Sequence, residues 1–268
     1  MFNIFRMHMY RVSKATSTLV IGILLVAFLI FGLGMAHLVY NNPLNLDFQT
    51  IMGTTGVFGT FTASDSHQFF IQGNDGFVIL ITIFAVILTN CDFTKGFAKN
   101  TYSMFEKRRP LVFAKWLALV ACITGTYIVY SFVSLGLSAA VIKTFEFGSA
   151  TEYFLGWLVV YICLISLVTV VFWITSLFKS PAGGMVIGVL IASDMFIVAE
   201  SFITLLIIKI TGSEKFIFSE YCLDYVLKIY NSGMGTADTV RTVIVALAYM
   251  ALALTLSVFL SDKKDVKI

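Results

Sequence analysis

Six long runs of mostly apolar residues divide this chain, and they constrain its fold more than any other feature. They cover residues 18–40, 76–91, 112–142, 154–178, 182–208 and 240–260, to within a few residues. A helix needs roughly 20 apolar residues to cross the hydrocarbon core of a bilayer. Only 12% of the residues are charged, whereas soluble domains carry about 25%. We therefore expect an all-α integral membrane protein, a single domain over residues 1–268, with six transmembrane helices.

The segment before the first run is predicted to be an interfacial helix that leads into the membrane. Its apolar residues recur at helical spacing with basic residues among them, a pattern typical of helices that lie on a lipid surface. The apolar residues are Phe2, Phe5, Met9 and Val12. The first run itself exceeds the apolar core of a signal peptide, and no cleavage motif of small residues follows at Met35–Tyr40. We expect it to remain as a membrane anchor.

The distribution of basic residues predicts which side of the membrane each loop occupies. If all six runs cross, thirteen of the 18 lysines and arginines fall on one side and five on the other. Basic residues are retained on the cytoplasmic side during insertion. We therefore expect a multi-pass protein of a bacterial plasma membrane, with both termini and the segment between the second and third runs in the cytoplasm.

That segment, DFTKGFAKNTYSMFEKRRP (92–110), is the most basic stretch of the chain. Four of its residues recur at i, i+4, i+7 and i+8, which predicts one face of a short amphipathic helix. They are Phe97, Thr101, Met104 and Phe105. Gly96 marks the start and Pro110 the stop, because proline disfavours helical geometry in the residue before it.

Such a basic segment has three ordinary roles. It fixes topology, lies on lipid, or docks its aromatic face into a groove on a partner protein. Nucleic-acid binding is excluded, because one short basic loop lacks the extended surface that follows a phosphate backbone.

The order of residues here resembles the segment after the second span of type-2 ATP-binding-cassette (ABC) permeases. The residues that carry the resemblance are Asp92, Phe93, Gly96, Asn100, Arg108, Arg109 and Lys115. The chain departs from the family pattern at Asp92, where Glu is usual, and at Phe97, where Thr is usual. The layout is also similar, with six spans, cytoplasmic ends and a long outer segment before the last span.

The resemblance implies a coupling helix that contacts a separate cytoplasmic ABC ATPase subunit. The implied coupling residues are Asp92, Phe93, Gly96, Phe97, Asn100, Thr101, Met104, Phe105, Lys107, Arg108 and Arg109. ATP and Mg would be bound by that ATPase and no cofactor by this chain. The resemblance further implies a second permease copy in a homodimer, short re-entrant or interfacial helices before the sixth span, and export of an amphipathic peptide such as a bacteriocin, an antimicrobial peptide or a helical toxin.

The fifth run contains two carboxylates, Asp194 and Glu200, in apolar surroundings. Charged groups inside a membrane are costly and usually face protein or a water-filled cavity. Six residues on an unbroken helix place these two about 120° apart, so they do not form one pair. Asp194 either hydrogen-bonds to a neighbouring span or lines a substrate path. Glu200, expected nearer the outer surface, either lies in water or lines the same path. Gly184 and Gly188 predict close approach of another helix.

Several kinds of chemistry are excluded by missing motifs. The chain has no G-x-x-x-x-G-K-[ST] loop for ATP phosphates and no H-E-x-x-H pair for zinc. We therefore expect a transport subunit rather than an enzyme, without catalytic or metal-binding residues. The alternatives are a secondary transporter that uses Asp194, an ABC exporter of lipid, drug or sodium, and a membrane scaffold that transports nothing.

Overall fold

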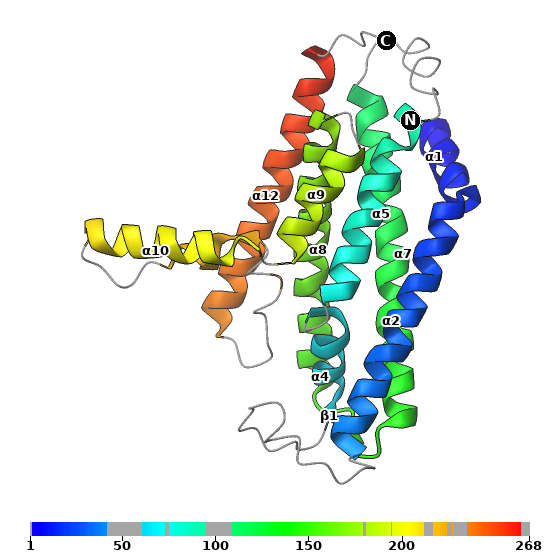
Figure 1. Cartoon of the computed structure of the whole chain (residues 1–268), viewed down its shortest axis with the longest axis vertical. Coiled ribbons are helices and arrows are strands. Elements are labelled where there is room, and N and C mark those ends of the chain that lie inside the picture. Colours follow the sequence, from blue (N-terminus) through cyan, green and yellow to red (C-terminus); the bar gives the residue numbers. More distant parts are fainter. Residues whose placement is uncertain are drawn as a thin grey trace.

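The computed structural model describes residues 2–41, 61–72, 75–94, 109–178, 181–193, 195–211, 217–223, 227 and 235–263. Within these ranges the chain is almost entirely helical, and most helices stand side by side in one elongated bundle (Figure 1). The prediction of an all-α fold is confirmed. The elements are α1 (Phe2–Lys14), α2 (Thr16–Asn41), β1 (Phe61–Thr62), α4 (Ala63–His67), the π-helical turn η1 (Gln68–Gln72), α5 (Asp75–Thr94), α7 (Arg109–Val141), β2 (Phe145–Glu146), α8 (Ala150–Phe178), α9 (Pro181–Ala192), α10 (Ile197–Thr211), the 3₁₀ turn η2 (Phe218–Tyr221) and α12 (Thr236–Lys263).

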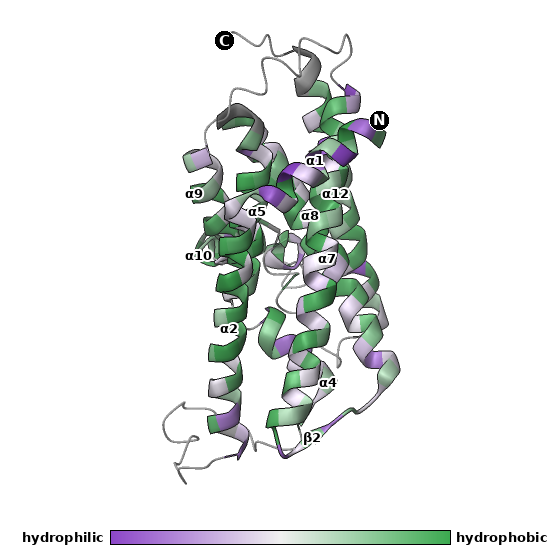
Figure 2. Cartoon of the chain, turned by 90° about the vertical axis from the view of Figure 1, so that its right-hand side faces the viewer, coloured by the Kyte–Doolittle hydropathy of each residue, from purple (hydrophilic) through white to green (hydrophobic). Residues whose placement is uncertain are grey.

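Four helices, α2, α7, α8 and α12, are long and apolar enough to cross a membrane. They correspond to the first, third, fourth and sixth predicted runs. Two further spans are obtained only if each of two bent pairs of helices forms a single span. One pair is α4–η1 with α5, bent by 51°, and the other is α9 with α10, bent by 61°. Hydrophobic residues dominate the helices along the bundle (Figure 2). The described residues are therefore compatible with a membrane protein of four to six spans.

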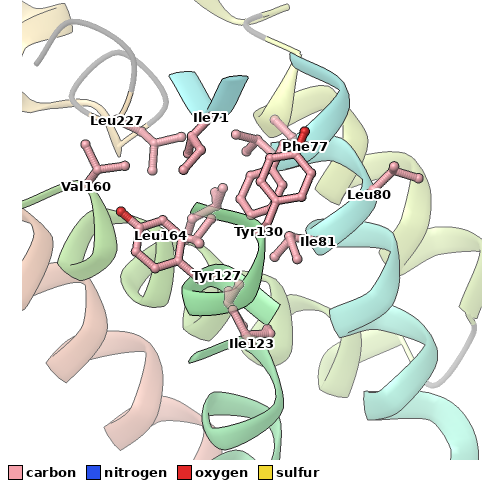
Figure 3. Packing of buried hydrophobic residues seen from close by; sticks show 14 of the residues in the cluster. Ile71, Phe77, Leu80, Ile81, Ile123, Tyr127, Tyr130, Val160, Leu164 and Leu227 are labelled. Atoms are coloured by element: carbon pink, nitrogen blue, oxygen red, sulfur yellow. The ribbon is translucent and has the colours of Figure 1, made fainter. Parts of the chain in front are cut away.

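Helix α8 forms the centre of the bundle. Two thirds of its most apolar window is buried, against about a fifth for α12. It packs against α5, α7, α9 and α12. Leu164, Val168 and Val171 on α8 are completely buried, and they join Ile81 of α5 and Ile123 of α7 in one continuous core (Figure 3). A helix that is apolar on all sides is buried by its neighbours in this way.

One end of the bundle gathers the parts of the chain that carry most basic residues. The starts of α1, α7 and α9 and the ends of α5, α8 and α12 all lie there (Figure 1). The end of α5 and the start of α7, which flank residues 95–108 in the sequence, both lie at this end (Figure 1). The helix α1 confirms the predicted amphipathic N-terminal helix.

The opposite end is held together by a short sheet and a side-chain clamp. Strands β1 and β2 pair in parallel, with Phe61 opposite Phe145. The side chain of Asn41 donates to the carbonyl of Val141 at 2.9 Å and accepts from the amide of Lys143 at 3.0 Å. These bonds join the last turn of α2 to the last turn of α7.

The predicted fifth span, 182–208, is wrong as one continuous helix. It is broken after Ala192, and α10 runs sideways from the bundle instead of continuing along it (Figure 1). Of the segment between α10 and α12, the structure describes residues 217–223, 227 and 235, which include η2. Leu223 and Leu227 are buried in the core, so this part of the chain folds back onto the bundle.

Candidate functional site

The candidate coupling site lies at the basic end of the bundle, between α5 and α7. Asp92 and Phe93 belong to the last turn of α5, and Arg109 is the first residue of α7. The remaining predicted coupling residues lie outside the described part of the chain: Gly96, Phe97, Asn100, Thr101, Met104, Phe105, Lys107 and Arg108. The predicted amphipathic helix therefore stays a prediction, while the two helices that carry it are defined.

Pro110 lies in the first turn of α7. The predicted helix that it was expected to end lies outside the described residues, so that role stays a prediction. Proline is favourable in a first turn, because the first amides of a helix have no partner within the helix and its fixed φ already suits helical geometry. Pro110 therefore helps to start α7 directly after the basic segment.

Helix α1 is packed onto the start of α7. Ile4 of α1 is buried against Leu111 and Ala114 of α7, with Met7 beside them. Arg11 and Lys14 lie in the last turn of α1, where positive charge is favourable next to the negative end of the helix dipole. Movement at the start of α7 is therefore coupled to α1.

Helix α5 connects the basic end to the broken pair of helices. It packs against α9, where Gly188 makes the contact with α5 close and Gly184 makes the contact with α8 close. A Cβ atom at Gly188 would lie 2.9 Å from Thr82 Cγ2 of α5, and one at Gly184 would lie 2.6 Å from Thr175 Oγ1 of α8. The predicted close approach at these glycines is confirmed, and it places α9 directly on α5 and α8.

The two carboxylates of the fifth run are separated by the break between α9 and α10. Asp194 lies between these helices and outside the described residues. Glu200 lies in the first turn of α10 and is only 6% exposed, so the expectation that it is in water is wrong. The angle of 120° between them also does not apply, because it assumed an unbroken helix.

Exposed apolar side chains cover most of α10. Val198, Phe202, Leu205 and Ile210 are between 62% and 82% exposed. The turn η2 packs on this helix, and the amide of Phe218 donates to Thr204 Oγ1 at 3.1 Å. The surface of α10 is therefore suited to lipid or to another apolar surface.

Sequence reasoning missed a buried polar cluster that joins α4, α7 and α8. Tyr127 donates its hydroxyl hydrogen to the carbonyl of Trp157 at 2.8 Å, and His67 Nε2 lies 2.8 Å from the same hydroxyl. Because the hydroxyl has one hydrogen, His67 must donate from Nε2. Ser66 and Ser138 also share a hydrogen bond, of 2.9 Å, between α4 and α7. The cluster fixes α4 against the two long helices.

One signal could have found this cluster. Ser131, Ser134 and Ser138 recur at i, i+3 and i+7, on one face of α7, and all three are buried. Small polar residues on one face of an apolar helix indicate contact with another helix. Among the described residues, no group of three His, Cys, Asp or Glu side chains could hold a metal ion.

Comparison with known proteins gives no family for this chain. No family model, no curated protein and no solved structure matches it.

Proposed function

We propose that this chain is the membrane subunit of an ATP-driven ABC exporter, working with a separate cytoplasmic ATPase and a second copy of itself. The observation that carries the proposal is the position of the two helix ends that flank the basic segment in the sequence. These helix ends, Thr94 of α5 and Arg109 of α7, lie at the same end of the bundle as the start of α1 and the end of α12 (Figure 1). This is the arrangement that a coupling helix between the second and third of six spans requires.

The packing of α5 and α7 supports transmission of force from this segment. Both helices continue from the segment deep into the bundle, α5 for 20 residues and α7 for 33. Helix α5 is fitted to α9 at Gly188, next to the break that precedes α10. A displacement of the basic segment by an ATPase would therefore move α5, and with it the α9–α10 pair.

The proposed cargo is an amphipathic peptide that enters from the bilayer. Apolar side chains are exposed on α9, α10 and α12, for example Val186, Phe202 and Leu252. A partly apolar cargo can reach such a surface through the bilayer, because its apolar face leaves few unpaired polar groups in hydrocarbon. Bacteriocins, antimicrobial peptides and helical toxins have this character.

Co-purification with an ATPase tests the proposal. The chain is co-expressed with candidate ABC ATPases from its own genome and purified in mild detergent. We expect the ATPase to be retained by the natural chain and lost from a Phe97→Asp/Phe105→Asp variant, because a charge on the docking face opposes burial. The control is Ser103→Asp, which places one such charge on the opposite face of the predicted helix.

The proposal is contradicted if the double variant retains the ATPase as well as the control does. Export of a candidate peptide into sealed vesicles, dependent on ATP, then tests the cargo separately from the partner.

A secondary transporter is the second candidate, and the break between α9 and α10 favours it. Discontinuous helices with ion-binding groups at the break are typical of secondary transporters. Asp194 lies within the break. Under this alternative, uptake driven by an ion gradient would be abolished by Asp194→Asn and would need no ATPase. Under the exporter proposal, transport by the Asp194→Asn variant still depends on ATP.

A further inference from the structure

A pocket of about 220 Å³ lies where the corner between α1 and α2 meets the last turns of α5. Val12, Ala15, Ile87 and Leu88 form its apolar wall, and Arg11 and Lys14 also line it. The corner is well defined, because Ala15 alone separates the two helices and its amide donates to the carbonyl of Val12. The hydroxyl of Thr18 donates to that same carbonyl at 2.7 Å.

The position of the pocket determines what it can bind. It lies at the start of the first span, where an amphipathic helix meets a membrane-spanning one. A ligand here would have an apolar part at the depth of the bilayer and a polar part at its surface. The volume is below the roughly 300 Å³ at which pockets for drug-sized molecules begin, so a narrow chain fits better than a bulky ring system.

We infer that this pocket binds one acyl chain of an anionic phospholipid, with the lipid phosphate against Arg11 and Lys14. Basic pockets between membrane helices on the cytoplasmic side recognise anionic lipid headgroups. The apolar wall receives the chain, and the two cations select the headgroup. No ATPase is needed for this binding, so the inference stands apart from the proposed function.

A second apolar hollow, near the other end of α2, provides an internal comparison. It measures about 580 Å³ and is lined by residues that include Phe31, Leu38 and Val141. No lysine or arginine is among the residues that line it. Lipid in that hollow would be held by its chain alone, and we expect no preference for an anionic headgroup there.

The pocket also lies next to the candidate coupling site. Leu88 and Cys91, in the last turns of α5, form part of its lining, and α5 leads directly into residues 95–108. A lipid in the pocket would therefore stabilise the end of α5 from which the basic segment begins.

Binding of short-chain lipids to the purified full chain tests the inference. Dioctanoyl phosphatidylglycerol is titrated against dioctanoyl phosphatidylcholine, with affinity measured by native mass spectrometry. Each basic residue near a membrane surface strengthens the binding of an anionic lipid about five-fold, so Arg11 and Lys14 together give about 30-fold. We therefore expect phosphatidylglycerol to bind about 30-fold more tightly than phosphatidylcholine. The Arg11→Gln/Lys14→Gln variant should lose this preference. The matched control is Arg6→Gln, which removes an exposed charge from the same helix outside the pocket.

Three results would overturn the inference. The first is equal affinity of the natural chain for the two lipids. The second is a loss of preference in Arg6→Gln as large as in the double variant, which would indicate general surface charge. The third is competition by glycerol 3-phosphate as strong as by the whole lipid, which would indicate a site for free phosphate.

A further variant tests the acyl chain itself. Ser17→Phe places a large ring at a position that lines the pocket. We expect it to weaken phosphatidylglycerol binding at least ten-fold while the melting temperature stays close to that of the natural chain. Unchanged lipid affinity in a folded Ser17→Phe protein would place the lipid elsewhere.

Discussion

At the scale of single residues, two kinds of contact hold the bundle together: close approach at glycine and hydrogen bonds between buried polar groups. The fit at Gly188 leaves no room for a further carbon atom beside Thr82. The bonds around Tyr127 satisfy a histidine and a backbone carbonyl in apolar surroundings. Each contact joins helices that are distant in the sequence, so a small chemical change at either should affect the whole bundle.

Gly188→Ala should destabilise the protein by about 1–3 kcal/mol, the usual cost of overpacking. The reason is that its new Cβ would lie 2.9 Å from Thr82 Cγ2. Gly22→Ala is the matched control, because no atom lies within 4 Å of a Cβ at that position. It should be neutral or stabilising by up to about 1 kcal/mol, since alanine favours helix more than glycine does. Thermal unfolding in detergent measures both, and a Gly188→Ala protein as stable as Gly22→Ala would contradict the packing of α9 on α5.

Tyr127→Phe should also destabilise the protein by about 1–3 kcal/mol. The substitution keeps the ring but leaves the Trp157 carbonyl and His67 Nε2 without their shared partner. Tyr10→Phe, at an exposed position on α1, removes the same hydroxyl and should change stability by less than about 0.5 kcal/mol. Equal melting temperatures for the two variants would show that the cluster contributes no stability.

At the scale of helices and strands, the bundle is joined at its ends by specific contacts. Thr62 and Asp65 form a capping box that starts α4, with each side chain accepting from the backbone amide of the other residue. The Asn41 clamp joins the ends of α2 and α7. At the other end, α1 is seated on α7 through Ile4 and Leu111. The helices are therefore fixed at both ends of the bundle.

Asn41→Ala should loosen the end of the bundle opposite the basic segment. The variant removes the acceptor for the Lys143 amide and the donor to the Val141 carbonyl. We expect hydrogen exchange at residues 142–146 to accelerate about ten-fold, as the loss of roughly 1–1.5 kcal/mol predicts. Asn3→Ala, at an exposed position on α1, should leave that exchange unchanged. Unchanged exchange in Asn41→Ala would show that the clamp does not hold this end.

Long apolar runs made α2, α7, α8 and α12 predictable to within a few residues, because length and hydropathy alone determine a spanning helix. The break after Ala192 could not be predicted in this way. No proline or glycine marks it, and one Ser-Asp pair hardly changes the hydropathy of the run. The cluster around His67 was missed because its partner Tyr127 is 60 residues away in the sequence. Contacts at such separation depend on how the helices pack, which a local pattern does not contain.

For the whole molecule, coupling to an ATPase requires that the end of the bundle with the flanking helix ends of the basic segment faces the cytoplasm. The described helices place residues 94 and 109 at one end and the start of α8 at the other (Figure 1). The excess of basic residues predicts that the first end faces the cytoplasm. An ATPase could reach the basic segment only in that orientation.

Cysteine labelling in intact cells tests this claim most directly. The four native cysteines, Cys91, Cys122, Cys163 and Cys222, are first replaced by serine or alanine. Single cysteines are then introduced by Ser103→Cys in the basic segment and by Ser149→Cys, exposed just before α8. A membrane-impermeant maleimide should label Ser149→Cys in whole cells and Ser103→Cys only after the membrane is permeabilised. Labelling of Ser103→Cys in intact cells would contradict the orientation and, with it, the proposal of an ATP-driven exporter.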